Sequence, residues 1–183
     1  MTTIQTFTDS SEAYIALGAN LGDREATLKE AISLLDEHPG ITVLRCSNMY
    51  ETDPVGYADQ PDFVNMAIAL QTTLTPEALL DVMLQTEQVL GRKRIVKNGP
   101  RTVDLDLLWV EGQQSATAHL ALPHPRMFER AFVLVPLADI VPTEEASGLY
   151  RRVHDALEQM DDKGGVRFWK ACNWASASVR SGS

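Results

Sequence analysis

Two carboxylates placed two residues apart are the feature of this sequence best suited to chemistry. Asp104 and Asp106 lie in an apolar segment that predicts a β-strand, so both side chains point to one face. Neighbouring carboxylates repel each other unless a cation lies between them. A Cα spacing of about 7 Å suits two Mg²⁺ ions about 4 Å apart. The opposite face is expected in the core and carries Leu105, Leu107 and Trp109.

A basic segment precedes the two aspartates. Residues 92–101 contain five of the sixteen Lys and Arg residues and no acid, although the chain has a formal net charge of −9. Arginine side chains bind phosphate oxygens bidentately, so arginines beside a hard-cation site indicate a site for nucleotide phosphates. Taken alone, the two aspartates could mark the polar end of a strand, and the basic segment could be a loop exposed to solvent. The glycine-rich G-x-x-x-x-G-K-[ST] and G-x-G-x-x-G patterns are absent.

Composition limits the class of protein. The 183 residues suffice for one domain with a substantial core, and the acidic balance argues against a nucleic-acid-binding protein. No apolar run approaches the roughly 20 residues of a membrane span, and the N-terminus lacks the pattern of a signal peptide. We therefore expect a cytoplasmic protein with no membrane partner. Cys46 and Cys172 have no metal-ligand spacing and are expected as reduced, largely buried thiols.

Apolar periodicity predicts a ferredoxin-like α+β sandwich of the order β-α-β-β-α-β. We expect a flexible extension at 1–12, a single domain at 13–174 and a flexible tail at 175–183. Two helices should cover one face of an antiparallel sheet and leave the other face for ligands or added elements. The strands are expected at 13–17, 41–50, 63–73 and 104–110. The helices are expected from Asp23 to His38 and from Pro76 to Gly91, followed by helices at 131–140 and 151–160 and a strand at 166–174.

Several further side chains have the chemistry of ligand contacts. Phe63 and Asn65 share one face of a predicted strand, where a ring and a carboxamide suit a planar heterocycle. Phe132 could supply a second ring, and His124 lies in a rigid Pro-His-Pro turn. Glu87 lies beside the apolar stripe of the second helix, either as an exposed edge residue or as a ligand contact. Phe63 could instead be a residue of the hydrophobic core, and His124 could have a structural role.

These residues together resemble the 6-hydroxymethyl-7,8-dihydropterin pyrophosphokinases of folate biosynthesis, from about Ala13 to Pro142. That resemblance implies transfer of pyrophosphate from ATP to the hydroxymethyl dihydropterin, whose hydroxyl attacks the β-phosphorus in line. It implies AMP as the second product and the ferredoxin-like fold. The segments that carry the resemblance are Tyr14–Gly22, Tyr50–Gly56, Gln60–Asn65, Gly99–Asp106 and Leu122–His124.

The resemblance also implies roles for individual residues. Two Mg²⁺ ions would be held by Asp104 and Asp106, and these two residues would act in catalysis with Arg92 and Arg101. ATP contacts are implied for Glu87, Arg92, Arg94, Arg101, His124 and Arg130. Pterin contacts are implied for Thr52, Asp53, Val55, Phe63, Asn65 and Phe132. The chain departs from the family at Asp53, a common proline, at Phe63, often tyrosine, and at Leu84, Asn98 and Pro125.

Two other classes of protein compete with this hypothesis. A ferredoxin-like RNA-binding or regulatory module would explain the fold and the basic segment, but not two adjacent carboxylates. An inactive relative that binds pterin or nucleotide would not need both aspartates and both arginines. We expect an enzyme that acts on small molecules, binds no nucleic acid and is a monomer.

Overall fold

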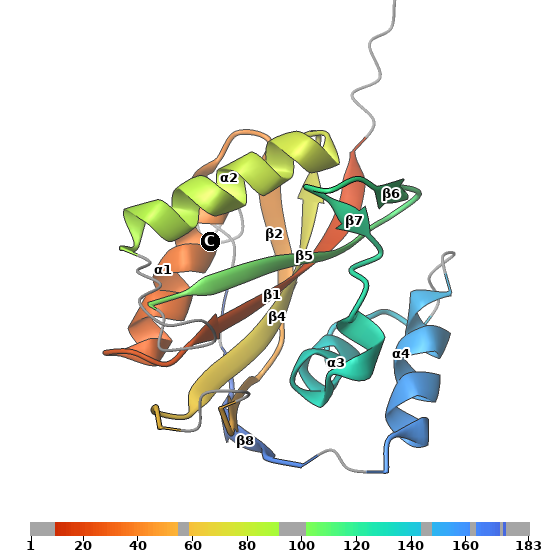
Figure 1. Cartoon of the computed structure of the whole chain (residues 1–183). Coiled ribbons are helices and arrows are strands. Elements are labelled where there is room, and N and C mark those ends of the chain that lie inside the picture. The colour runs from red at the N-terminus through yellow and green to blue at the C-terminus, as the bar shows by residue number, and fades with distance from the viewer. Residues whose placement is uncertain are drawn as a thin grey trace, which may run out of the picture.

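The computed structural model describes residues 10–54, 59–91, 102–143, 148–161, 164–172 and 174. An antiparallel sheet with helices on both faces forms the molecule (Figure 1). Its strand order is β5-β1-β4-β3-β8, and β2 pairs with β4 beside β3. The strands are β1 (Ser11–Ala19), β2 (Ile41–Cys46), β3 (Met49–Thr52), β4 (Phe63–Thr72), β5 (Asp104–Val110) and β8 (Val166–Lys170), with a small hairpin of β6 (Ser115–Ala116) and β7 (Ala121–Leu122).

Two amphipathic helices cover one face of the sheet, as the sequence predicts (Figure 1). Helix α1 (Arg24–Glu37) begins where the Asp23 carboxylate accepts a hydrogen bond from the Ala26 N–H. Helix α2 (Pro76–Val89) is capped in the same way by Thr75 and starts with proline. Their apolar sides pack on the residues of β4 that point to this face, Val64, Met66, Ile68 and Leu70. Leu84 of α2, one of the positions at which the chain departs from the family, is 46% exposed.

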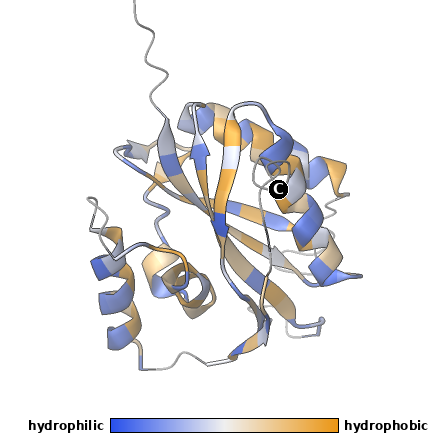
Figure 2. Cartoon of the chain, turned by 180° about the vertical axis from the view of Figure 1, so that it is seen from behind, coloured by the Kyte–Doolittle hydropathy of each residue, from blue (hydrophilic) through white to orange (hydrophobic). Residues whose placement is uncertain are grey.

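The other face of the sheet is covered by the C-terminal part of the chain. Helix α3 (Ala131–Ala138) follows the short 3-10 helix η1 (Met127–Glu129), and α4 (Leu149–Gln159) packs against α3. Between these helices and the sheet lies a second hydrophobic core, which includes Leu134 and Leu137 of α3 and Val153 of α4. Ala67 and Ala69 of β4 also belong to this second core, and their small side chains allow α3 to pack close to the sheet. In Figure 2, which shows the molecule from behind, the solvent side of α4 is largely hydrophilic. Among the described residues, no helix is both long enough and apolar enough to cross a membrane.

Three details differ from the sequence prediction. Strand β1 begins at Ser11, inside the extension expected at 1–12, because Ser11 and Glu12 pair with β4. The expected strand at 41–50 is broken into β2 and β3, because the buried Ser47 hydroxyl accepts a hydrogen bond from the Ala67 N–H. The prediction for Trp109 is also wrong. The pairing of β5 with β1 shifts by one residue, from Leu107 opposite Ile15 to Trp109 opposite Tyr14. This β-bulge turns Trp109 to the face of Asp104 and Asp106, where it packs on the second core.

Candidate active site

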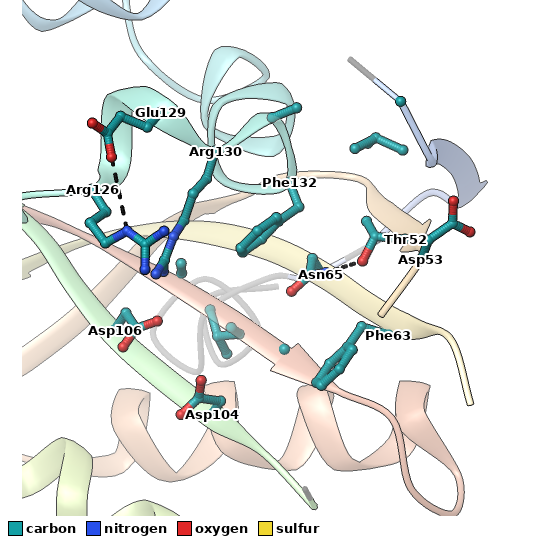
Figure 3. A pocket seen from close by; sticks show the side chains of 16 residues that line it. Thr52, Asp53, Phe63, Asn65, Asp104, Asp106, Arg126, Glu129, Arg130 and Phe132 are labelled. Carbon is teal, nitrogen blue, oxygen red and sulfur yellow. Dashed lines mark hydrogen bonds and ion pairs between the residues drawn. The ribbon is translucent and has the colours of Figure 1, made fainter. Parts of the chain in front are cut away.

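A cavity of about 430 Å³ opens between β1, β4, β5 and the start of α3. Its walls bring together residues that lie far apart in the sequence, and Figure 3 shows their side chains. Of the predicted site residues, the cavity is lined by Thr52, Asp53, Phe63, Asn65, Asp104, Asp106, Arg130 and Phe132. The predicted residues Val55, Arg92, Arg94 and Arg101 lie outside the described residues.

The two carboxylates of β5 share one face of the strand, as predicted. Asp104 and Asp106 both line the cavity, while Leu105 and Leu107 are buried in the core beneath α1 and α2. Within the described part of the chain, no group of three His, Cys, Asp or Glu side chains could hold a metal ion. Two carboxylates on one face of a strand could hold Mg²⁺, which keeps positions for phosphate oxygens and water at nucleotide sites.

Arg130 faces these carboxylates from the other side of the cavity (Figure 3). Burial lowers the pKa of its guanidinium, as does the charge of Arg126, whereas Asp106 and Asp104 act in the opposite direction. The guanidinium also lies 5.6 Å from the centre of the Phe132 ring. An always-charged, planar donor thus lies between the carboxylates and an aromatic wall, where it can bind a phosphate group.

The second half of the cavity has the shape expected for a flat, polar ligand. In Figure 3 the rings of Phe63 and Phe132 lie on either side of Asn65. The Asn65 amide donates a hydrogen bond to the Thr52 hydroxyl at 2.6 Å, which fixes its orientation. Gly18 of β1 lies opposite Asn65, and a Cβ at Gly18 would stand 2.7 Å from the Asn65 Oδ1. A side chain at position 18 would therefore have to displace the carboxamide from this place.

Glu87 lies beneath the cavity and not among the residues that line it. Its side chain is buried, and Oε1 accepts a hydrogen bond of 2.9 Å from the Leu105 N–H. The interpretation of Glu87 as an exposed edge residue is therefore wrong. Since Leu105 separates Asp104 from Asp106, the Glu87 carboxylate fixes the backbone between the two cavity carboxylates.

His124 also lies outside the cavity lining and is half-buried. Its Nδ1 accepts a hydrogen bond of 3.2 Å from the Arg126 N–H, so the neutral ring carries its proton on Nε2. Burial lowers the pKa of His124, and the charges of Arg130 and Arg126 lower it further. The ring is thus a neutral hydrogen-bond donor at neutral pH.

Sequence reasoning missed half of the sixteen residues that line the cavity, among them Gly18, Arg126, Glu129, Gly164 and Val166. Arg126 and Glu129 belong to the turn before α3 and form an ion pair of 3.9 Å. Gly164 and Val166 come from the C-terminal region, to which the sequence assigned no role, and no local pattern marked them.

The comparison with known proteins agrees with this arrangement. Residues 14–142 match the model of the 7,8-dihydro-6-hydroxymethylpterin-pyrophosphokinase (HPPK) family. The chain belongs to the HPPK family. It is 47% identical over 171 residues to the 2-amino-4-hydroxy-6-hydroxymethyldihydropteridine pyrophosphokinase of Bacillus subtilis, covering 93% of this chain and 98% of that protein. The protein of the same name from Methylorubrum extorquens is 46% identical over 154 residues, which cover 84% of this chain and 96% of that one.

A solved structure supports the fold. Plasmodium falciparum HPPK-DHPS, crystallised with pterin and p-hydroxybenzoate, is similar with a TM-score of 0.62 and 15% sequence identity. The match covers 87% of this chain but 45% of that one, so this chain spans less than half of the solved protein. HPPK domains are ferredoxin-like α+β folds, and the predicted fold class is confirmed. As a member of the HPPK family, this protein is an ATP-dependent pyrophosphokinase of folate biosynthesis and uses ATP as co-substrate.

Proposed function

We propose that this enzyme transfers pyrophosphate from ATP to 6-hydroxymethyl-7,8-dihydropterin, with Mg²⁺ held by Asp104 and Asp106. The observation that carries the proposal is that one cavity contains both a carboxylate pair and a pocket of aromatic and amide side chains. The two substrates would then meet at the boundary between these halves. AMP and the pterin pyrophosphate are the expected products.

The carboxylate end of the cavity suits the triphosphate. Asp104 and Asp106 would hold two Mg²⁺ ions, which when bound neutralise phosphate charge and favour in-line displacement at the β-phosphorus. Arg130 would bind a phosphate oxygen from the opposite wall, since its guanidinium faces both aspartates. Arg92 and Arg101 are proposed to stabilise charge on the triphosphate, and Arg94, Glu87 and His124 to contribute to ATP binding. For Glu87, the bond to the Leu105 N–H supports a contribution through the position of β5.

The aromatic end of the cavity suits the pterin. Phe63 and Phe132 would stack on the two faces of the ring, and Asn65 would bind its polar edge. The bond from Asn65 to Thr52 leaves the carboxamide oxygen toward the side where Gly18 makes room. Asp53 and Val55 would complete this end of the site. Enclosure by these side chains would hold the substrate hydroxyl in position for attack and limit access of water.

The proposed partners of the enzyme are its two substrates. We propose that the enzyme acts as a monomer. We also propose that it binds no nucleic acid, because its formal net charge of −9 disfavours contact with a phosphate backbone.

The test is a coupled assay of AMP release with ATP, Mg²⁺ and 6-hydroxymethyl-7,8-dihydropterin. We expect turnover by the wild-type protein and a loss of about 10³-fold or more in Asp106→Asn, since a metal site contributes several kcal/mol to phosphoryl transfer. Asp81→Asn, on the exposed side of α2, is the matched control and should keep wild-type turnover. Circular dichroism and thermal melting would show that both variants fold.

Two outcomes would count against the proposal. An inactive wild-type protein that folds correctly would remove the substrate assignment. An active Asp106→Asn variant, with the same dependence on Mg²⁺ concentration as the wild type, would remove the metal role of the carboxylate pair.

A further inference from the structure

The last strand of the sheet lies beyond the residues that match the family model, yet it reaches the cavity. β8 pairs antiparallel with β3, and Val166 stands opposite Thr52. Val166 and Gly164 line the cavity together with Thr52 and Asp53. Directly paired residues point to the same face of a sheet, so Val166 lies on the side to which Thr52 presents its hydroxyl.

Arg167 fastens this strand to both ends of the connection between β3 and β4. Its Nη1 donates a hydrogen bond to Asp53 Oδ1 at 3.0 Å, and its Nη2 donates to Asp62 Oδ2 at 3.1 Å. Asp53 directly follows β3, and Asp62 directly precedes β4. One planar guanidinium thereby binds two carboxylates at the ends of neighbouring strands, which a single-point donor such as lysine does not do equally well.

The backbone brings β8 close to Asp53. The Asp53 N–H donates a hydrogen bond to the Gly165 carbonyl at 3.3 Å, and Arg167 Nη1 donates to the same carbonyl at 3.1 Å. Gly165 has φ +75°, and a Cβ there would lie 2.8 Å from the Asp53 Cγ. Glycine at this position therefore allows both the left-handed turn and the close approach to Asp53.

We propose that β8 forms a wall of the pterin subsite, with Val166 facing the substrate and Arg167 as the positioning residue that holds this wall against Asp53 and Asp62. This inference rests on the proposed function, because it assigns the nearby end of the cavity to the pterin. Loosening the wall should weaken pterin binding and leave ATP binding and the chemical step nearly unchanged, since the carboxylates of β5 lie at the other end.

The experiment compares three variants of the full chain by steady-state kinetics, each with one substrate varied while the other is saturating. Arg167→Gln should raise the pterin KM about three- to tenfold, the range expected for the loss of exposed ion pairs, with kcat and the ATP KM within about twofold. Arg167→Lys should recover part of this loss. Lys170→Gln is the matched control, because Lys170 lies on the same strand but pairs with Glu25 of α1.

A direct binding measurement completes the test. Titration calorimetry with the dihydropterin and a non-hydrolysable ATP analogue should show weaker pterin binding in Arg167→Gln than in the wild type. In the double variant, Asp62→Asn should cause little further loss of pterin affinity. If the wild type is active and Arg167→Gln has the same pterin affinity as Lys170→Gln, then β8 held by Arg167 does not form a wall of the pterin subsite. If the wild type binds no pterin at all, the proposed function fails first, and the two failures are thus distinguishable.

Discussion

At the scale of single residues, Gly18 determines whether the Asn65 carboxamide can occupy its place in the cavity. We predict that Gly18→Ala raises the pterin KM about tenfold, because the added methyl group would displace Asn65 and cost about one hydrogen bond. The ATP KM should change much less. Steady-state kinetics with each substrate varied in turn would measure both constants.

Gly22→Ala provides the control for this prediction. Gly22 has φ +62°, and nothing lies within 4 Å of an added Cβ, so alanine there strains the backbone without touching the cavity. This variant should melt at a lower temperature yet keep the wild-type pterin KM. An equal rise of the pterin KM in both variants would mean that Gly18 acts through stability alone.

At the scale of elements, Arg152 attaches α4 to the rest of the second core. Its guanidinium lies 4.2 Å from the centre of the Phe128 ring and 5.4 Å from that of Trp109. An exposed cation–π contact contributes about 0.5–1 kcal/mol, so we predict that Arg152→Gln lowers the melting temperature by about 2–4 °C. Arg151→Gln, next to it on α4, is the control for loss of charge. Equal melting temperatures of the two variants would contradict the prediction.

At the scale of the whole molecule, His124 links stability to pH. Its pKa in the folded protein lies below the usual 6.5, so the unfolded chain binds more protons in the window between these values. Stability therefore rises with pH across this window, is fully present above about pH 6.5, and decreases as the pH falls. We predict a lower urea midpoint at pH 5.5 than at pH 7.5.

The contribution of His124 to the pH dependence of stability can be measured separately from that of the carboxylates. His124→Asn retains an acceptor for the Arg126 N–H but cannot titrate, so it should flatten the pH dependence of the urea midpoint. His119→Asn, in the exposed hairpin between β6 and β7, is the matched control and should keep the wild-type dependence. If His124→Asn keeps it too, another group causes the effect.

The sequence alone determined much of this protein, because its strongest signals are local. Apolar periodicity predicted the two helices, with Asp23 and Pro76 at their starts, and the period of a strand placed Phe63 and Asn65 on one face. The spacing of Asp104 and Asp106 placed both carboxylates on one face, since a strand repeats every two residues. The segments that match the family supplied the activity.

Only the tertiary structure decided the rest, because it depends on pairing between distant strands. The β-bulge beside Leu108 reversed the face of Trp109, and the burial of Glu87 became visible only with β5 against α2. The same holds for β8: nothing local in Val166 or Arg167 indicates a cavity wall. Strand order brings these residues beside Asp53, more than a hundred positions away in the chain.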